Sequence, residues 1–222
     1  LGLPDALLGA AWPTMYPQLG AQVSWAGGVS MIISACTILS ALASDRLNER
    51  LGTGRVTAIS VATTAAALLG FSFCHAFWQL CLWAIPYGLG AGSVDAALNN
   101  YVALHYKSRH MSWLHCMWGV GASLGPVIMG QALAGSGWQG GYRIIGILQV
   151  VLTVVLLFSL PLWKLPQDAM GGEPFTPQHR SFPELLKITG VPEVLVCFLC
   201  YCALESTAGM WASRYSNQVR GL

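Results

Sequence analysis

The chain has 222 residues, of which 55% are hydrophobic and only 9% are charged, and its formal net charge is +2. A soluble domain carries about 25% charged residues, so this composition, with a mean hydropathy of +0.56, indicates a protein that crosses a lipid bilayer several times. The small net charge and the lack of a basic cluster interleaved with aromatic residues exclude a nucleic-acid partner.

Six or seven apolar segments follow one another, each near the roughly 20 residues that a spanning helix needs. They are residues 3–19, 25–43, 55–74, 77–104, 111–134, 142–163 and 191–215. No hairpin signal or short alternating run suggests a barrel, so we expect an all-α polytopic membrane protein. The chain starts without Met and ends soon after an apolar run, so we expect it to be part of a longer protein.

Residues 165–190 form the one long polar stretch, rich in Pro and Gly, and this composition predicts a flexible cytoplasmic linker. Ser181 is a candidate cap for a short amphipathic helix within it. We therefore expect a six-helix transmembrane bundle over residues 1–164, the linker, and the first helix of a second bundle over residues 191–222.

Basic residues gather on one side of the predicted membrane. Eight of the eleven lie there: Arg46, Arg50, Arg55, Lys107, Arg109, Lys164, Arg180 and Lys187. The positive-inside rule then puts the loops at 44–55, 105–110 and 165–190 in the cytoplasm, and we expect a plasma (inner) membrane location. Four tryptophans near the predicted boundaries agree as interfacial anchors: Trp25, Trp78, Trp138 and Trp163.

The second and third segments are joined by a sequence that contains Asp45-Arg46 and, further on, Gly52 and Arg55. This sequence resembles the loop signature of the major facilitator superfamily, G-x-x-x-D-R-x-G-R-[KR], although Ala41 stands at the leading Gly and a short insertion displaces the later residues. The resemblance implies that Asp45, Arg46 and Arg55 help to close a cytoplasmic gate. The alternative is a solvated loop that only sets topology.

The fifth segment contains Gly121-x-x-x-Gly125-Pro126. Small residues four apart let another helix approach closely, and packing can compensate for the hydrogen bond that Pro removes. The motif is similar to the helix-five signature of the same superfamily. A general packing motif is the alternative interpretation.

Asp95 lies inside the fourth apolar segment. A carboxylate at a helix centre costs about 2.5–3.5 kcal/mol on insertion scales, so such a residue usually faces a bundle interior or a watery cavity. Asn99 is four residues on and shares its helix face. Together they offer a group that can carry a proton and an amide that can bind sugar hydroxyls. Alternatively, they only tie helices together.

His115 and Trp118 are neighbours at i and i+3, and Trp12, Trp118 and Tyr201 are candidate stacking surfaces for a sugar ring. Glu205 lies four residues after Tyr201. For both His115 and Glu205, a purely structural role stays open.

The sequences Leu3-Pro-Asp5 and Tyr201-Cys-Ala-Leu-Glu205, with their surroundings, resemble the fucose-permease-like branch of sugar transporters. That branch uses acidic residues in helices one and four for substrate binding and proton coupling. The resemblance therefore implies that role for Asp5 and Asp95.

We expect a secondary active transporter of a small polar solute, a sugar, with possible proton coupling and alternating access. No ATP-binding motif is present, and we expect no metal, no cofactor and no enzymatic activity. A drug or metabolite exporter of the same superfamily is the alternative. An intramembrane enzyme built on Ser93, Asp95 and His115 lacks a supporting motif, and a membrane scaffold would leave Asp95 replaceable.

Overall fold

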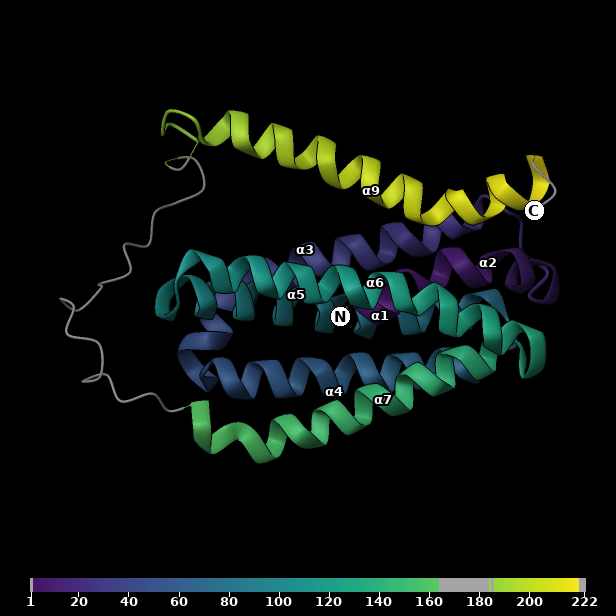
Figure 1. Cartoon of the computed structure of the whole chain (residues 1–222), viewed down its shortest axis with the longest axis horizontal. Helices are drawn as coiled ribbons and strands as arrows, with labels where there is room; N and C mark the ends of the chain where they lie inside the picture. The colour runs from purple at the N-terminus through teal and green to yellow at the C-terminus, as the bar shows by residue number, and fades with distance from the viewer. Residues whose placement is uncertain (1, 164–183, 185, 220–222) are drawn as a thin grey trace. The chain divides into compact units, whose positions relative to one another are not determined.

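The computed structural model describes residues 2–163, 184 and 186–219. Helices form the regular structure of these residues (Figure 1): α1 (Gly2–Asp5), α2 (Leu7–Gln18), α3 (Trp25–Leu51), α4 (Thr53–Ser72), α5 (Phe77–His105), α6 (Ser108–Gly135), α7 (Gly137–Ser159), the 3-10 helix η1 (Leu160–Trp163) and α9 (Val191–Val219). The predicted all-α polytopic fold is confirmed. Most of the expected linker, with Ser181, falls outside the described residues.

Five helical spans in the described part of the chain are long and apolar enough to cross a membrane. They are Trp25–Leu51, Thr53–Ser72, Ser108–Gly135, Gly137–Trp163 and Val191–Ala208. Two of the seven expected segments are not among them. The first is broken by a turn at Ala6 into α1 and a 12-residue α2, and the fourth, α5, has 29 residues but carries Asp95 and several other polar side chains within its length.

The chain divides into two compact units, Leu1–Trp163 and Lys164–Leu222. In the first unit, α5 packs along α3 and α4, and α4 also packs along α7. On the other side, α1 and α2 pack against α6, which in turn contacts α7. Apart from α1 and α2, which continue in one direction, successive helices of the first unit run in opposite directions (Figure 1), so helix ends and short turns form both ends of the unit.

The predicted small-residue motif of α6 seats α1. A Cβ atom at Gly121 would lie 2.9 Å from the Leu3 amide nitrogen, and one at Gly125 would collide with the Leu3 carbonyl oxygen. A Cβ at Gly119 would meet nothing within 4 Å. The motif therefore allows close helix approach as expected, and the helix that uses it is α1.

The connection expected at residues 44–55 is helical instead. Helix α3 continues to Leu51, and Gly52, with φ of +79°, is the joint from which α4 starts at Thr53. Charged residues such as Arg46 and Arg50 are good helix formers, so they end the apolar stretch without ending the helix. At 27 residues, α3 is about 40 Å long and projects beyond a hydrocarbon layer of about 30 Å.

Trp138 is not an interfacial anchor. Helix α7 starts at Gly137, whose φ of +75° suits glycine, five residues before the expected start of that segment at Tyr142. This earlier start makes Trp138 fully buried, and its indole N–H donates a 2.7 Å hydrogen bond to Gln18 Oε1. The tryptophan therefore ties α7 to the end of α2.

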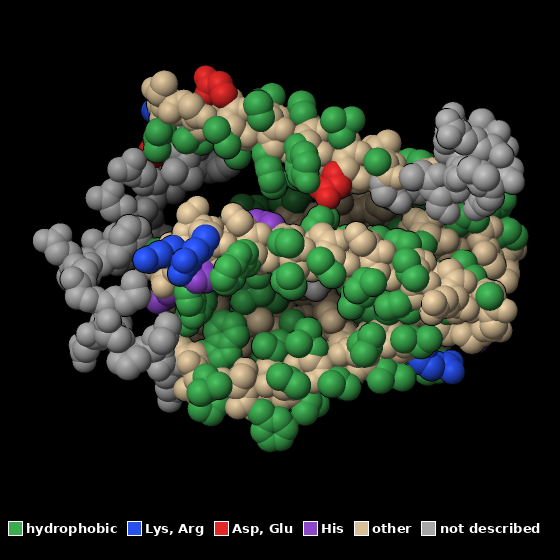
Figure 2. Space-filling view, viewed as in Figure 1, with side chains coloured by type: hydrophobic (Ala, Val, Ile, Leu, Met, Phe, Trp, Pro, Cys, Tyr) green, Lys and Arg blue, Asp and Glu red, His purple; other side chains and the backbone are tan. Residues whose placement is uncertain are grey.

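The outer surface of the first unit suits contact with lipid. Figure 2 shows hydrophobic side chains over the faces of α6 and α7 and basic side chains at the helix ends. Exposed residues of α7 include Leu148, Val151, Val155 and Phe158. An apolar surface of this extent on a helical bundle is typical of a membrane protein.

Candidate functional site

The Asp5 carboxylate connects three helices of the first unit. Its Oδ1 accepts a 2.8 Å hydrogen bond from the Tyr87 hydroxyl on α5. Its Oδ2 accepts a 2.9 Å hydrogen bond from the indole Nε1–H of Trp118 on α6. Helices α5 and α6 make few direct contacts with each other, so Asp5 at the end of α1 bridges them.

The two partners show the depth of this group. Trp118 lies near the middle of α6, and Tyr87 lies about one turn before the middle of α5. Asp5 therefore lies at mid-length of the bundle rather than at its surface end. A carboxylate at this depth needs donors for its oxygens, and here each oxygen has one.

Asp95 lies further along α5, about one turn past its middle, and its side chain is exposed. It has no hydrogen-bond partner among the residues that the structure describes. It does interact electrostatically with Asp5 and with His115, which is exposed on α6 one turn before Trp118. The structure thus brings together Asp5, Asp95, His115 and Trp118.

Asn99 follows Asp95 by one helical turn, as the sequence predicts. Its Oδ1 is buried and has no hydrogen-bond partner. A buried amide oxygen without a donor is unusual in a folded protein and calls for an explanation. A solute hydroxyl donating to it is one explanation consistent with a binding site.

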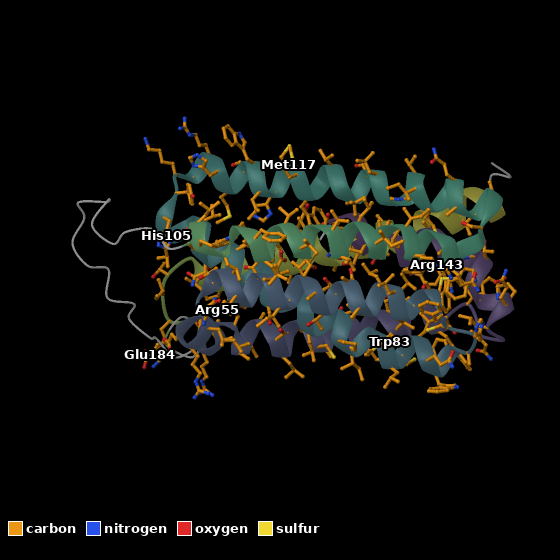
Figure 3. The ribbon with its side chains drawn as sticks, turned by 90° about the horizontal axis from the view of Figure 1, so that it is seen from below. Arg55, Trp83, His105, Met117, Arg143 and Glu184 are labelled. Atoms are coloured by element: carbon orange, nitrogen blue, oxygen red, sulfur yellow. The ribbon has the colours of Figure 1, made fainter. Side chains whose placement is uncertain are left out.

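The middle of the bundle is poor in positive charge. The described basic residues of the first unit lie in helix ends or turns: Arg46, Arg50, Arg55, Lys107, Arg109 and Arg143. Figure 3 shows Arg55 and His105 at one end of the unit and Arg143 at the other. Two carboxylates and one histidine at mid-length therefore form a site that disfavours anions.

Other predicted site residues lie elsewhere. Trp12 is 3% exposed and donates its indole N–H to the Val23 carbonyl oxygen at 2.9 Å, so it does not offer a stacking face. Tyr201 and Glu205 belong to α9 in the second unit and lie one helical turn apart. Their part in a solute site stays a prediction.

The predicted gate residues are all exposed at one end of the first unit. Asp45 and Arg46 lie in the last turns of α3, and Arg55 lies in the first turn of α4. No ion pair joins these three within the described part of the chain. A gating role for them stays a prediction.

Sequence reasoning missed Tyr87. Its side chain is 5% exposed, and it lies eight residues before Asp95 on α5. A buried tyrosine usually finds a partner for its hydroxyl, so a tyrosine inside a segment with a carboxylate was a usable signal. The partner, however, is on α1, which no spacing along α5 reveals.

Further polar groups join helices inside the unit. The Ser40 hydroxyl on α3 bonds to Ser93 on α5, and the Gln149 amide on α7 donates to Thr64 on α4 at 3.2 Å. These groups are buried and have partners. Ser93 is therefore part of helix packing rather than a nucleophile beside Asp95.

A bundle of membrane-spanning helices with unpaired carboxylate and amide groups at mid-length defines a membrane transport protein, because intramembrane ionisable groups normally serve a solute or ion path. The family model described as Major Facilitator Superfamily matches residues 1–222. The chain therefore belongs to the Major Facilitator Superfamily, a family of transporters and not of enzymes. A comparison with curated proteins finds no significant match.

Proposed function

We propose that this protein is a secondary active transporter that moves a sugar by alternating access and couples that movement to protons. The observation that carries the proposal is the mid-length cluster of Asp5, Asp95, Asn99 and His115. Asp5 is held by two donors, whereas Asp95 and the Asn99 oxygen have none. Open acceptors of this kind suit a solute that donates several hydrogen bonds.

A sugar meets these requirements well. Its hydroxyl groups can donate to the Asp95 carboxylate and the Asn99 oxygen. Trp118 is partly exposed, so its ring can also cover an apolar sugar face. The scarcity of basic residues at this depth favours a neutral solute over a phosphorylated or acidic one.

The same groups support the proposed proton coupling. No ATP-binding motif is present, so an ion gradient is the available energy source. Asp95 and His115 interact electrostatically, and such groups inside a membrane can take up and release a proton during a transport cycle. We further propose that the helix ends carrying Asp45, Arg46 and Arg55 close the cytoplasmic side in a plasma membrane.

The test is uptake of labelled fucose and other monosaccharides by the purified protein in proteoliposomes, with and without an inward proton gradient. We expect gradient-driven uptake by the wild type and none by Asp95→Asn, because the variant can no longer exchange a proton at this position. Asn100→Ala, an exposed polar neighbour on α5, is the matched control and should keep uptake.

Lack of uptake of every sugar by correctly inserted wild-type protein would contradict the sugar proposal. Transport of apolar cations in exchange for protons would then favour the exporter alternative. Uptake that continues unchanged in Asp95→Asn would remove Asp95 from the coupling mechanism.

A further inference from the structure

Asp5 and Asp95 lie in the same short sequence. The first occurrence is Gly2-Leu-Pro-Asp5-Ala6-Leu-Leu8, and the second is Gly92-Ser-Val-Asp95-Ala96-Ala-Leu98. Both read Gly-x-x-Asp-Ala-x-Leu. The repeat suggests that α1 and α5 begin two related halves of the first unit.

The packing of the two glycines supports this relation. A Cβ at Gly2 would collide with the Trp118 carbonyl oxygen on α6, and a Cβ at Gly92 would collide with the Thr37 carbonyl oxygen on α3. Thus α1, in the first predicted membrane segment, packs on α6 in the fifth. In the same way α5, in the fourth segment, packs on α3 in the second. That exchange is what an inverted repeat of three helices produces, and it makes Trp118 and Thr37 equivalent positions.

The two carboxylates nevertheless have different surroundings. Trp118 donates to Asp5, but the hydroxyl of its counterpart Thr37 donates to the Gly88 carbonyl oxygen at 3.2 Å instead of to Asp95. Tyr87 also donates to Asp5. One half of the repeat therefore has an anchored carboxylate, and the other half has a free one.

We propose that Tyr87 is a positioning residue of the solute site, which holds Asp5 in place across α1, α5 and α6 so that the equivalent Asp95 is the carboxylate left open to the solute. This inference rests on the proposed transport function. Tyr87 itself is buried, so it affects the solute site by holding Asp5 and not by touching the solute. Asp95 interacts electrostatically with both Asp5 and His115, so these three ionisable groups share one region.

Uptake kinetics with labelled fucose test the positioning role. Tyr87→Phe removes one hydrogen bond to a charged group, and we expect KM to rise about tenfold or more with little change in maximal rate. Trp118→Phe should act in the same direction. Tyr142→Phe is the matched control, because Tyr142 is equally buried and also contacts Phe71 but does not bond to Asp5. Equal KM changes in Tyr87→Phe and Tyr142→Phe would overturn the proposal.

A double-mutant cycle tests the bond without any solute. The melting temperatures of Asp5→Asn, Tyr87→Phe and the double variant are measured on the intact protein in detergent. We expect the double variant to lose little more than the worse single variant, since both remove the same bond. Additive losses would overturn the inference. If the wild type moves no sugar, the proposed function fails, and the cycle alone still decides whether Tyr87 holds Asp5.

Discussion

At the scale of single residues, polar side chains inside this bundle fall into two groups. Several have a partner on another helix, as Asp5 does with Tyr87 and Trp118. Asp95 and the Asn99 oxygen have none in the described structure. Because an unpaired polar group is costly away from water, the paired groups hold helices together and the unpaired ones are candidates for solute contact.

Gln149 belongs to the group that holds helices together. It is buried on α7 and donates to Thr64 on α4 at 3.2 Å. Gln149→Ala loses this bond and leaves a cavity, so we expect a loss of about 1–2 kcal/mol in unfolding free energy. Thermal unfolding of the purified protein in detergent measures it. Gln131→Ala, at an exposed position of α6, should unfold like the wild type, and an equal loss in both variants would contradict the prediction.

At the scale of elements, close helix pairs depend on residues without side chains. Gly88 on α5 lies against the Ile33 carbonyl oxygen on α3, where a Cβ would come within 2.5 Å. Gly90 lies against Ser60 on α4, where the corresponding distance is 2.7 Å. Gly88 and Gly90 are two residues apart and so face different sides of α5, where one allows close contact with α3 and the other with α4.

The α1–α6 contact gives a test with an internal control. Gly125→Val would push α1 away because the new side chain meets the Leu3 backbone, whereas Gly119→Val points into open space. We expect Gly125→Val to lower the unfolding free energy by about 1–3 kcal/mol and to lose the proposed solute uptake, since it also displaces Asp5. Gly119→Val should retain both. Thermal unfolding and uptake are the measurements, and equal behaviour of the two valine variants would refute this account.

At the scale of the whole molecule, charge predicts how the protein lies in the membrane. Arg55 and Arg143 lie at opposite ends of the first unit (Figure 3). Five of the six described basic residues of that unit gather at the Arg55 end, which the positive-inside rule assigns to the cytoplasm. The rings of Tyr101 and Trp163 in the first unit also contact each other near this end, with their centroids 5.2 Å apart.

Cysteine labelling in intact cells checks this orientation. With the seven native cysteines replaced by alanine, Arg143→Cys should react with a membrane-impermeant maleimide from outside. Arg55→Cys should react only after the cells are permeabilised. The reverse pattern would show that the predicted topology is inverted, and it would move the proposed gate residues to the outer side.

The membrane class and the all-α fold could be predicted from the sequence, because they depend on the length of the apolar segments and on charge asymmetry. The superfamily came from the resemblance of Asp45-Arg46 and of Gly121-x-x-x-Gly125-Pro126 to its signatures. Asp95 could be recognised as a candidate site residue because a carboxylate in an apolar segment is visible without coordinates, whereas Asp5 was a candidate through the resemblance to a family branch. The end of α3 was predicted too early, because charged residues end an apolar segment but do not end a helix. Trp138 was wrongly predicted to be interfacial, because burial by α2 cannot be seen along α7.

Which carboxylate has hydrogen-bond donors in the described structure and which has none could be seen only once the helices were packed together. The partners of Asp5 are 82 and 113 residues away in the chain, and no local periodicity encodes a contact at that separation. The same holds for Gly125 and Leu3, whose pairing depends on how α1 and α6 come together. Side-chain chemistry along one helix is a local property, whereas the pairing of donors with acceptors across helices depends on the packing of the whole bundle.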